Sequence, residues 1–267
     1  MTTLIQISDT HFGTEQPPVV AALVELTHRI KPAAVILSGD ITQRARRSQF
    51  SAARRFVEQL EVPAYLAIPG NHDIPLFNVV ARMFFPYAGF QRAFGATLEP
   101  RLECDGYTVI GVNTTRASRH KDGEVSAEQI QRVAADLRAA ASNRVRIVVT
   151  HQPVHVLRPG EIHNRLHGYE RAVRAWSDAG ADIIMGGHIH LPYTALLRDH
   201  FPGLSRRCWV VQAGTAVSHR VRAHHPNSVN LLVREPAALV CRVERWDYDA
   251  NSRGFRCVSA QQLSLDR

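Results

Sequence analysis

Lysine is nearly absent from this sequence of 267 residues, although the chain is basic. Lys31 and Lys121 are its two lysines, so arginine supplies almost all of the positive charge, and the net charge is +8. Arginine pairs with phosphate through two parallel hydrogen bonds, which favours an anionic ligand. A solvated arginine-rich surface explains the same composition, and charge alone does not separate the two. The chain has no basic tail, helix-turn-helix or aromatic–basic platform, so nucleic acid is not an expected partner.

Long apolar runs and paired cysteine motifs are also missing. No stretch approaches the ~18 apolar residues of a membrane-spanning helix. A strand is expected within three residues of Met1, which leaves no room for a signal peptide. We therefore expect a cytoplasmic protein without a membrane partner. The four cysteines show no CxxC spacing and are expected to be buried thiols rather than a disulfide or a zinc site: Cys104, Cys208, Cys241 and Cys257.

Side chains that bind metals follow short β-rich apolar runs at five places. The runs cover residues 4–7, 34–37, 65–68, 147–149 and 183–185. The clusters that follow them are Asp9-Thr10-His11, Gly39-Asp40, Gly70-Asn71-His72-Asp73, His151 and Gly187-His188-Ile189-His190. Loops that follow the strands of an α/β sheet meet at one edge, where ligands usually bind. The clusters are therefore predicted to converge into one site with enough ligands for two divalent ions.

Strands and helices are expected to alternate in the first part of the chain. The predicted strands are 3–8, 33–38, 64–68, 101–104, 107–113, 145–150 and 182–186, and the predicted helices are 17–30, 46–60, 126–140 and 166–179. Residues 74–100 are expected to be irregular. After His190 the pattern is all β, with strands at 193–198, 207–213, 228–234 and 237–246. We expect one domain over residues 1–246 and a polar, partly ordered C-terminal tail over 247–267.

The five clusters, in this order, resemble the motifs of the calcineurin-like metallophosphoesterases. That family carries Asp-x-His, Gly-Asp, Gly-Asn-His-Asp/Glu, His and Gly-His-x-His, and the match extends from residue 4 to about residue 215. Any one motif is weak, but five in order, each after a strand, are hard to reach by chance. The resemblance implies an α/β fold, a four-layer αββα sandwich of two mixed sheets flanked by helices.

The resemblance also assigns roles in a two-metal site. It implies that one ion is held by Asp9, His11, Asp40 and His190, and the other by Asn71, His151, His188 and the same Asp40. The cofactors would be two divalent ions, and mixed nitrogen and oxygen ligation suits Mn, Fe, Zn or Co. A hydroxide generated by the two ions would attack phosphorus. His72 would act as general acid, with Asp73 orienting its ring, although a structural role for His72 is the alternative.

The reaction implied is hydrolysis of a small anionic phosphoester. The Gly-Asn-His-Asp motif and residues 123–129 are most similar to the bacterial cyclic-nucleotide phosphodiesterase group, so a nucleotide such as a 3′,5′-cyclic nucleotide is the expected substrate. The chain departs from that group at Asn113-Thr114, where Asp-Ser is usual, and at Thr150-His151-Gln152-Pro153, where His-His-Pro-Pro is usual. Both departures are expected near the base or ribose.

Several alternatives stay open. A phosphomonoesterase or a nuclease of the same superfamily is possible, but no added DNA-recognition region is present. A lipid-precursor pyrophosphatase is disfavoured, because that branch carries arginine in place of His72. An inactive partner-binding scaffold would lose ligands, whereas all seven remain. Substrate contacts from Arg44, Arg46, Arg47 and the Gly214–Arg220 loop are undecided, as are the oligomeric state and a place for His120, His155, His163 and His167 at the site.

Overall fold

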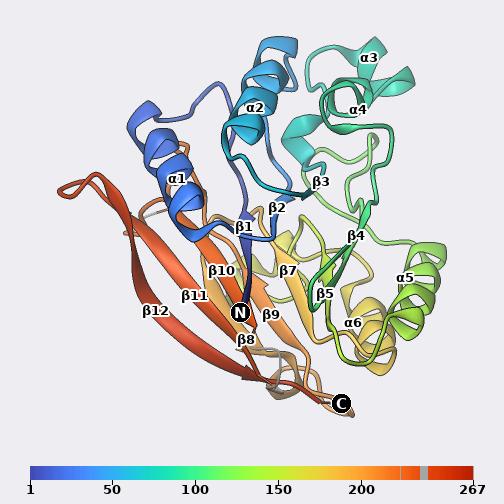
Figure 1. Cartoon of the computed structure of the whole chain (residues 1–267). Coiled ribbons are helices and arrows are strands. Elements are labelled where there is room, and N and C mark those ends of the chain that lie inside the picture. Colours follow the sequence, from blue (N-terminus) through green and yellow to red (C-terminus); the bar gives the residue numbers. More distant parts are fainter. Residues whose placement is uncertain (223, 235–239, 267) are drawn as a thin grey trace.

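Two mixed β-sheets packed face to face form the centre of the computed structural model, which describes residues 1–222, 224–234 and 240–266 (Figure 1). The first sheet has the order β12 (Gly254–Ser264), β11 (Val240–Asp249), β10 (Ser228–Arg234), β1 (Thr2–Ile7), β2 (Ala34–Ser38) and β3 (Tyr65–Ile68). The second has the order β4 (Arg101–Cys104), β5 (Tyr107–Gly111), β6 (Val145–Val149), β7 (Ile183–Gly186), β9 (Trp209–Gln212) and β8 (Tyr193–Leu196). β1, β2 and β3 are parallel, as are β5, β6, β7 and β9.

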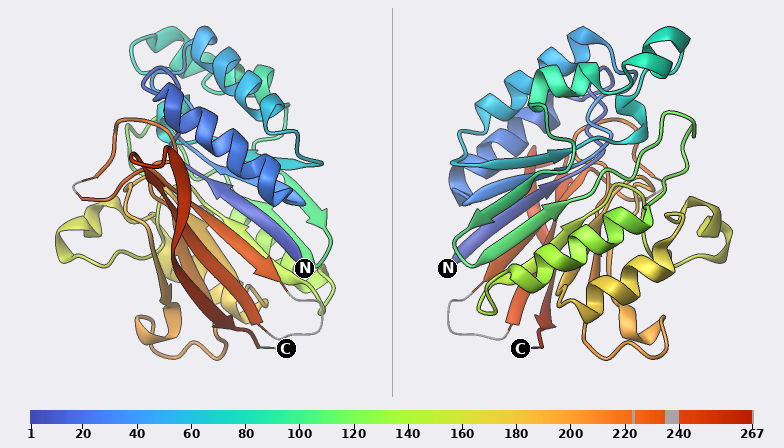
Figure 2. Two further views of the ribbon diagram at one scale, coloured as in Figure 1. Left: turned by 60° about the vertical axis from the view of Figure 1, so that its left-hand side comes forward. Right: turned by 90° about the vertical axis from the view of Figure 1, so that its right-hand side faces the viewer.

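Helices cover the outer face of each sheet. α1 (Pro17–Ile30) and α2 (Arg47–Gln59) share a core cluster with β1 and β2, whereas α5 (Ala127–Ala139) and α6 (Tyr169–Asp178) share another with β6, β7 and β9. A third cluster, which includes Ile36 and Met185, lies between the two sheets. Figure 2 shows the two helical layers on opposite sides of the strands. The predicted αββα sandwich is confirmed.

Local signals place most elements within a few residues of their predicted bounds. The Ser126 hydroxyl accepts a hydrogen bond from the Gln129 amide, so α5 begins directly after this capping box. Gly106, at a φ of 79°, closes the β4–β5 hairpin. Cys208 and Cys241 are buried as expected, but Cys104 is only half-buried and Cys257 is exposed. None of the described helices is long and apolar enough to cross a membrane.

The prediction that residues 74–100 are irregular is wrong. They contain α3 (Val79–Phe84) and α4 (Ala88–Phe94). The Asn78 side chain accepts a hydrogen bond from the Ala81 amide and so caps α3, and Gly95 ends α4 at a φ of 104°. These caps are visible in the sequence, but three prolines and two very short helices leave no 3.6-residue pattern to read.

The C-terminal segment is also not the polar, partly ordered tail that was expected. The predicted boundary after residue 246 falls inside β11, and β12 pairs antiparallel with β11 from Val240↔Ser264 to Asp249↔Gly254. β12 is an edge strand whose side chains are mostly exposed, so its sequence lacks the alternation that marks a half-buried strand. The predicted start of β11 at residue 237 lies outside the described residues.

Candidate metal centre

The loops after five strands bring the predicted ligands together. Asp9 and His11 follow β1, Asp40 follows β2, Asn71 lies in the 3₁₀ turn η1 (Asn71–Asp73) after β3, His151 follows β6, and His188 and His190 follow β7. Three groups of side chains have ligand atoms within 4.8 Å of one another. Two of them share no residue and are called the first and second set: Asp9, His11 and His190, and Asp40, His151 and His188. The third group, His11, Asp40 and His72, overlaps both.

Asp40 lies between these two sets. Its Oδ1 is 3.2 Å from Nε2 of His151, and its Oδ2 is 3.8 Å from Nε2 of His11. The carboxylate is 2% exposed and also accepts a hydrogen bond of 2.8 Å from the His72 amide. One oxygen therefore faces each set, which is the arrangement that a ligand shared by two ions requires.

In the first set, the donor atoms point at one another. Nε2 of His190 is 3.2 Å from Oδ1 of Asp9 and 3.1 Å from Nε2 of His11. Nδ1 of His190 lies 2.6 Å from the carbonyl oxygen of Arg220, to which it donates. This bond fixes the tautomer that leaves Nε2 free to act as a ligand.

The second set has the same design. Nδ1 of His151 donates to the carbonyl oxygen of Ser38 at 2.9 Å, so Nε2 is the ring nitrogen that is left to bind a metal ion once it has lost its proton. Nε2 is buried, and among the described residues its polar neighbour is Oδ1 of Asp40 at 3.2 Å, without a well-aligned hydrogen bond. Nδ1 of His188 is 3.0 Å from Oδ1 of Asn71. A buried nitrogen without a donor, beside a carboxylate and an amide oxygen, fits a divalent cation.

The electrostatics suit ligation. Burial lowers the pKa of His11 to about 3 and that of His188 to about 4, so both rings are neutral at pH 7. Burial also lowers the pKa of His151, but the adjacent Asp40 carboxylate outweighs it and raises that pKa to about 9, so a metal ion at this place would have to displace the proton on Nε2. Burial raises the pKa of Asp40, yet the surrounding imidazoles hold it well below its usual value. Asp40 is therefore a carboxylate at neutral pH.

The backbone at the site adopts left-handed conformations at several candidate ligands. Five of the candidate ligands have left-handed φ angles between 43° and 71°: Asp9, His11, Asp40, His188 and His190. Such angles are uncommon outside glycine and cluster at functional sites. Two motif positions need glycine for different reasons. Gly39 has a φ of 95°, which other residues rarely adopt, and a side chain at Gly70 would overlap the Asp40 backbone.

His72 lies beside the candidate ligands, but Asp73 does not orient it. Nδ1 of His72 donates to the carbonyl oxygen of Gln43 at 2.8 Å. The Asp73 carboxylate instead accepts four hydrogen bonds, from the amides of Ile41, Thr42 and Gly70 and from the Thr42 hydroxyl. The predicted orienting role of Asp73 is wrong. Its side chain ties the loop after Asp40 to the turn that carries Asn71.

A cavity of about 450 Å³ opens onto both sets of ligands. His120 and Lys121 line it from the loop after β5, and Arg220 and Arg222 line it from the loop after β9. Arg220 belongs to the Gly214–Arg220 loop, which does fold back to the site, since the Thr215 hydroxyl donates to the Asp9 carbonyl at 2.5 Å. Sequence reasoning left Lys121 without a role and missed Ser38 and Gln43, which act through carbonyl groups that every residue has.

Other side chains that were considered for substrate contact do not line this cavity. Arg44 lines a small hollow beside His72, whereas Arg46 and Arg47 are exposed at the start of α2. Asn113 and Thr114 do not line the cavity; the Thr114 hydroxyl bonds to the buried Gln152 side chain.

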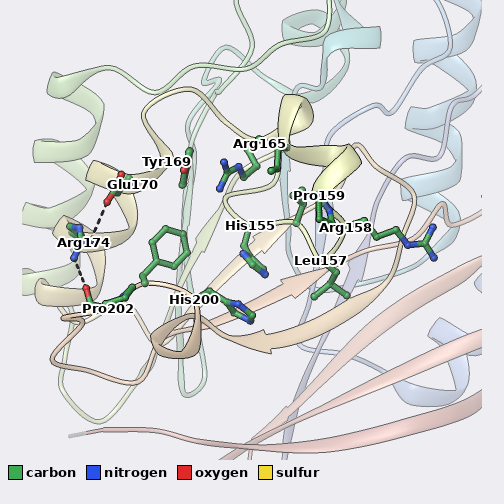
Figure 3. A pocket seen from close by; sticks show the side chains of 13 residues that line it. His155, Leu157, Arg158, Pro159, Arg165, Tyr169, Glu170, Arg174, His200 and Pro202 are labelled. Atoms are coloured by element: carbon green, nitrogen blue, oxygen red, sulfur yellow. Dashed lines mark hydrogen bonds and ion pairs between the residues drawn. The ribbon is translucent and has the colours of Figure 1, made fainter.

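The histidines that follow His151 do not reach the cavity of about 450 Å³ beside the candidate ligands, which we call the metal cavity. His155 lines a different cavity of about 320 Å³, where it stacks on His200 with ring centroids 4.0 Å apart (Figure 3). His163 and His167 are exposed and are not among the residues that line the metal cavity.

Comparison with known proteins identifies the family of this chain. A family model for the calcineurin-like phosphoesterases matches residues 2–192. The chain belongs to this family. The resemblance read from the motifs is confirmed, and the chain is a hydrolase of phosphoester bonds with His and Asp groups that could bind metal ions.

Individual relatives are distant. A protein from Arcobacter nitrofigilis named “Probable glycerophosphodiester phosphodiesterase” is 25% identical over 206 residues, 72% of this chain and 73% of that protein. One from Synechococcus sp. named “Probable cyclic nucleotide phosphodiesterase” is 26% identical over 161 residues, 56% of this chain and 57% of that protein. A dimetal phosphatase from Danio rerio shares the fold, with a TM-score of 0.68 over 99% of both chains at 12% identity.

Proposed function

We propose that this phosphoesterase is a phosphodiesterase that works with two divalent metal ions. One ion would be held by Asp9, His11, Asp40 and His190, and the other by Asn71, His151, His188 and Asp40. Manganese, iron, zinc and cobalt all suit this mixture of imidazole, carboxylate and amide ligands. The names of the two sequence relatives support a diester substrate.

The position of Asp40 is the observation that carries this proposal. Its two oxygens face different imidazoles, at 3.2 Å and 3.8 Å, and the carboxylate is almost fully buried. A buried charge without compensation is very costly, so a carboxylate in this place needs cationic partners. An inactive scaffold would have no reason to keep it there together with all six other ligands.

The remaining chemistry belongs to the protein side chains. A pair of divalent ions, when bound, would polarise the phosphoryl oxygens and lower the pKa of water. His72 lines the same cavity, with its Nδ1–H held by the Gln43 carbonyl, so the doubly protonated ring could give its Nε2 proton to the departing alkoxide. Lys121 and Arg220 line the cavity from two different loops and can pair with the phosphate.

We propose a nucleotide-sized substrate, with 3′,5′-cyclic nucleotides as the first candidates. The cavity of about 450 Å³ is within the range of ~300–1,000 Å³ that is usual for small-molecule sites. Its cationic lining suits an anionic ligand, and the relative from Synechococcus supports this class.

A hydrolysis panel tests the proposal. Chelator-treated protein is assayed with and without Mn²⁺ on a nitrophenyl phosphodiester and the matching monoester, followed by cyclic mononucleotides, linear dinucleotides and single-stranded DNA. We expect metal-dependent hydrolysis with a higher kcat/KM for the diester. A tenfold or greater preference for the monoester would instead identify a phosphomonoesterase, and a preference for DNA would identify a nuclease. No metal-dependent hydrolysis of any substrate would contradict the proposal.

A further inference from the structure

The most exposed apolar surface of the described chain is confined to one short segment. Six large hydrophobic side chains within residues 77–85 are 64–78% exposed: Phe77, Val79, Val80, Met83, Phe84 and Phe85. We call this set the apolar ridge. The other strongly exposed large hydrophobic residues described are scattered along the chain. Single exposed apolar residues are ordinary, but a contiguous exposed patch usually marks an interaction site.

The ridge lies at the rim of the metal centre. It begins at Phe77, shortly after η1 ends at Asp73, and Figures 1 and 2 show α3 at the outer edge of the molecule. Ile74 and Leu76, just before the ridge, line the small hollow that also contains Asn71 and His72. Whatever covers the ridge therefore comes close to the mouth of the cavity.

The ridge is held in place with its apolar side chains outward. Arg82, on the same helix, donates to the carbonyl oxygens of Pro75 at 3.2 Å and Arg119 at 2.8 Å. Asn78 caps the helix through the Ala81 amide at 2.9 Å. These polar contacts anchor α3 to the loop that carries Lys121, while the hydrophobic residues stay unburied.

The surroundings of the ridge are cationic. Residues 74–98 contain Arg82 and Arg92 and no aspartate or glutamate, in a chain whose net charge is +8. The Arg44 guanidinium lies over the Phe77 ring, 5.4 Å from its centroid, and Lys121 is exposed on the adjoining loop. A second copy of the chain would bring like charges together, whereas an anionic surface would complement them.

We propose that the apolar ridge inserts into the interface of an anionic lipid bilayer and brings the mouth of the metal cavity to the membrane surface. Aromatic and aliphatic side chains beside arginines are the composition of segments that lie in the headgroup region. Basic side chains add attraction to anionic lipids. This inference goes beyond the proposed function, and it replaces the sequence expectation of no membrane partner, which considered spanning helices and a signal peptide.

Vesicle sedimentation tests the inference. The metal-free full chain is mixed with vesicles of phosphatidylcholine alone or with added phosphatidylglycerol. We expect binding to the anionic vesicles that weakens at high salt. The double variant Phe84→Ser, Phe85→Ser should bind at least about tenfold more weakly, because two large apolar side chains no longer enter the bilayer. Val258→Ser, which changes a half-exposed apolar residue on β12, should bind like the wild type.

The assay requires no hydrolysis, so its result is independent of the proposed function. Circular dichroism of the double variant is the control for folding, and its spectrum should match that of the wild type. Equal binding of the wild type and the double variant, or equal binding to both kinds of vesicle, would overturn the inference. Failure of the wild type to bind either kind of vesicle would also overturn it. If the wild type instead forms a concentration-dependent dimer that the double variant does not form, the ridge joins two copies of the chain and the membrane inference is wrong.

Discussion

Replacing Asp73 should damage the architecture of the metal centre rather than remove a catalytic group. The Asp73 side chain is 1% exposed and accepts hydrogen bonds from the amides of Ile41 at 3.0 Å, Thr42 at 2.7 Å and Gly70 at 2.9 Å. In Asp73→Ala these three amides lose their partner. Each buried donor left unsatisfied costs about 1–3 kcal/mol, so after partial relaxation the free energy of unfolding should fall by about 4 kcal/mol.

Asp73→Asn separates the hydrogen bonds from the shape of the side chain. It keeps one carbonyl acceptor but presents an amide N–H to the other donors, so a loss of about 2 kcal/mol is expected. Both variants are measured by urea unfolding of chelator-treated protein, with Asp199→Asn, at an exposed position in a short turn, as the control. Metal affinity should fall in the same order, because Asp73 joins the loops that carry Asp40 and Asn71.

Turnover with saturating metal distinguishes this role from catalysis. We expect both Asp73 variants to lose the same proportion of activity on a nitrophenyl diester and on a diester with an alkoxide leaving group. A variant with the stability of the wild type and a loss confined to the poor leaving group would refute the reasoning and return Asp73 to the proton-transfer step.

Three further perturbations test other parts of the molecule, two at the site and one in the separate cavity that His155 lines. Gly70→Ala should lose metal affinity and at least about 1–3 kcal/mol of stability, because its methyl group would overlap the Asp40 backbone, whereas Gly160→Ala, which faces open space, should be neutral in urea unfolding and metal titration. His72→Ala should keep its metal and lose about 10²–10⁴-fold in kcat on poor leaving groups but much less on nitrophenolate; missing metal would make His72 a ligand, since it lies within reach of His11 and Asp40. Burial lowers the folded-state pKa of His155 to about 4 from 6.5, so its contribution to stability is intact above pH 6.5 and is lost as pH falls toward 4. His155→Gln should therefore flatten the pH dependence of unfolding in that window by up to about 1.4 kcal/mol per pH unit relative to wild type, and parallel curves would contradict it.

The parts of the fold that the sequence predicts are those in which local pattern and burial agree. α1 begins at Pro17, as the two prolines indicate, and β2 is buried on both faces, so its apolar run is unbroken. In the elements that were missed, β12 and α3, the local sequence pattern and the burial of the side chains do not agree. β12 is held by backbone pairing with β11 while most of its side chains remain exposed, and α3 leaves its apolar residues unburied.

The candidate site also has a part that the sequence predicts and a part that it does not. Its ligand side chains could be predicted because only a few residue types bind metals and because the strands that precede them are recognisable. The supporting contacts could not. Ser38 and Arg220 fix the tautomers of His151 and His190 through backbone carbonyls, which carry no sequence signal. Asp73 was misassigned because adjacency in the sequence suggested a contact with His72, whereas its carboxylate turns toward the loop after β2.

The central claim is that Asp40 is shared by two metal ions. Anomalous diffraction from crystals grown with Mn²⁺ tests it most directly, because each bound ion gives its own peak. We predict two peaks, one among Asp9, His11 and His190 and the other among Asn71, His151 and His188, with a different oxygen of Asp40 ligating each. A single peak at saturating Mn²⁺, or two peaks that Asp40 does not join, would contradict the account.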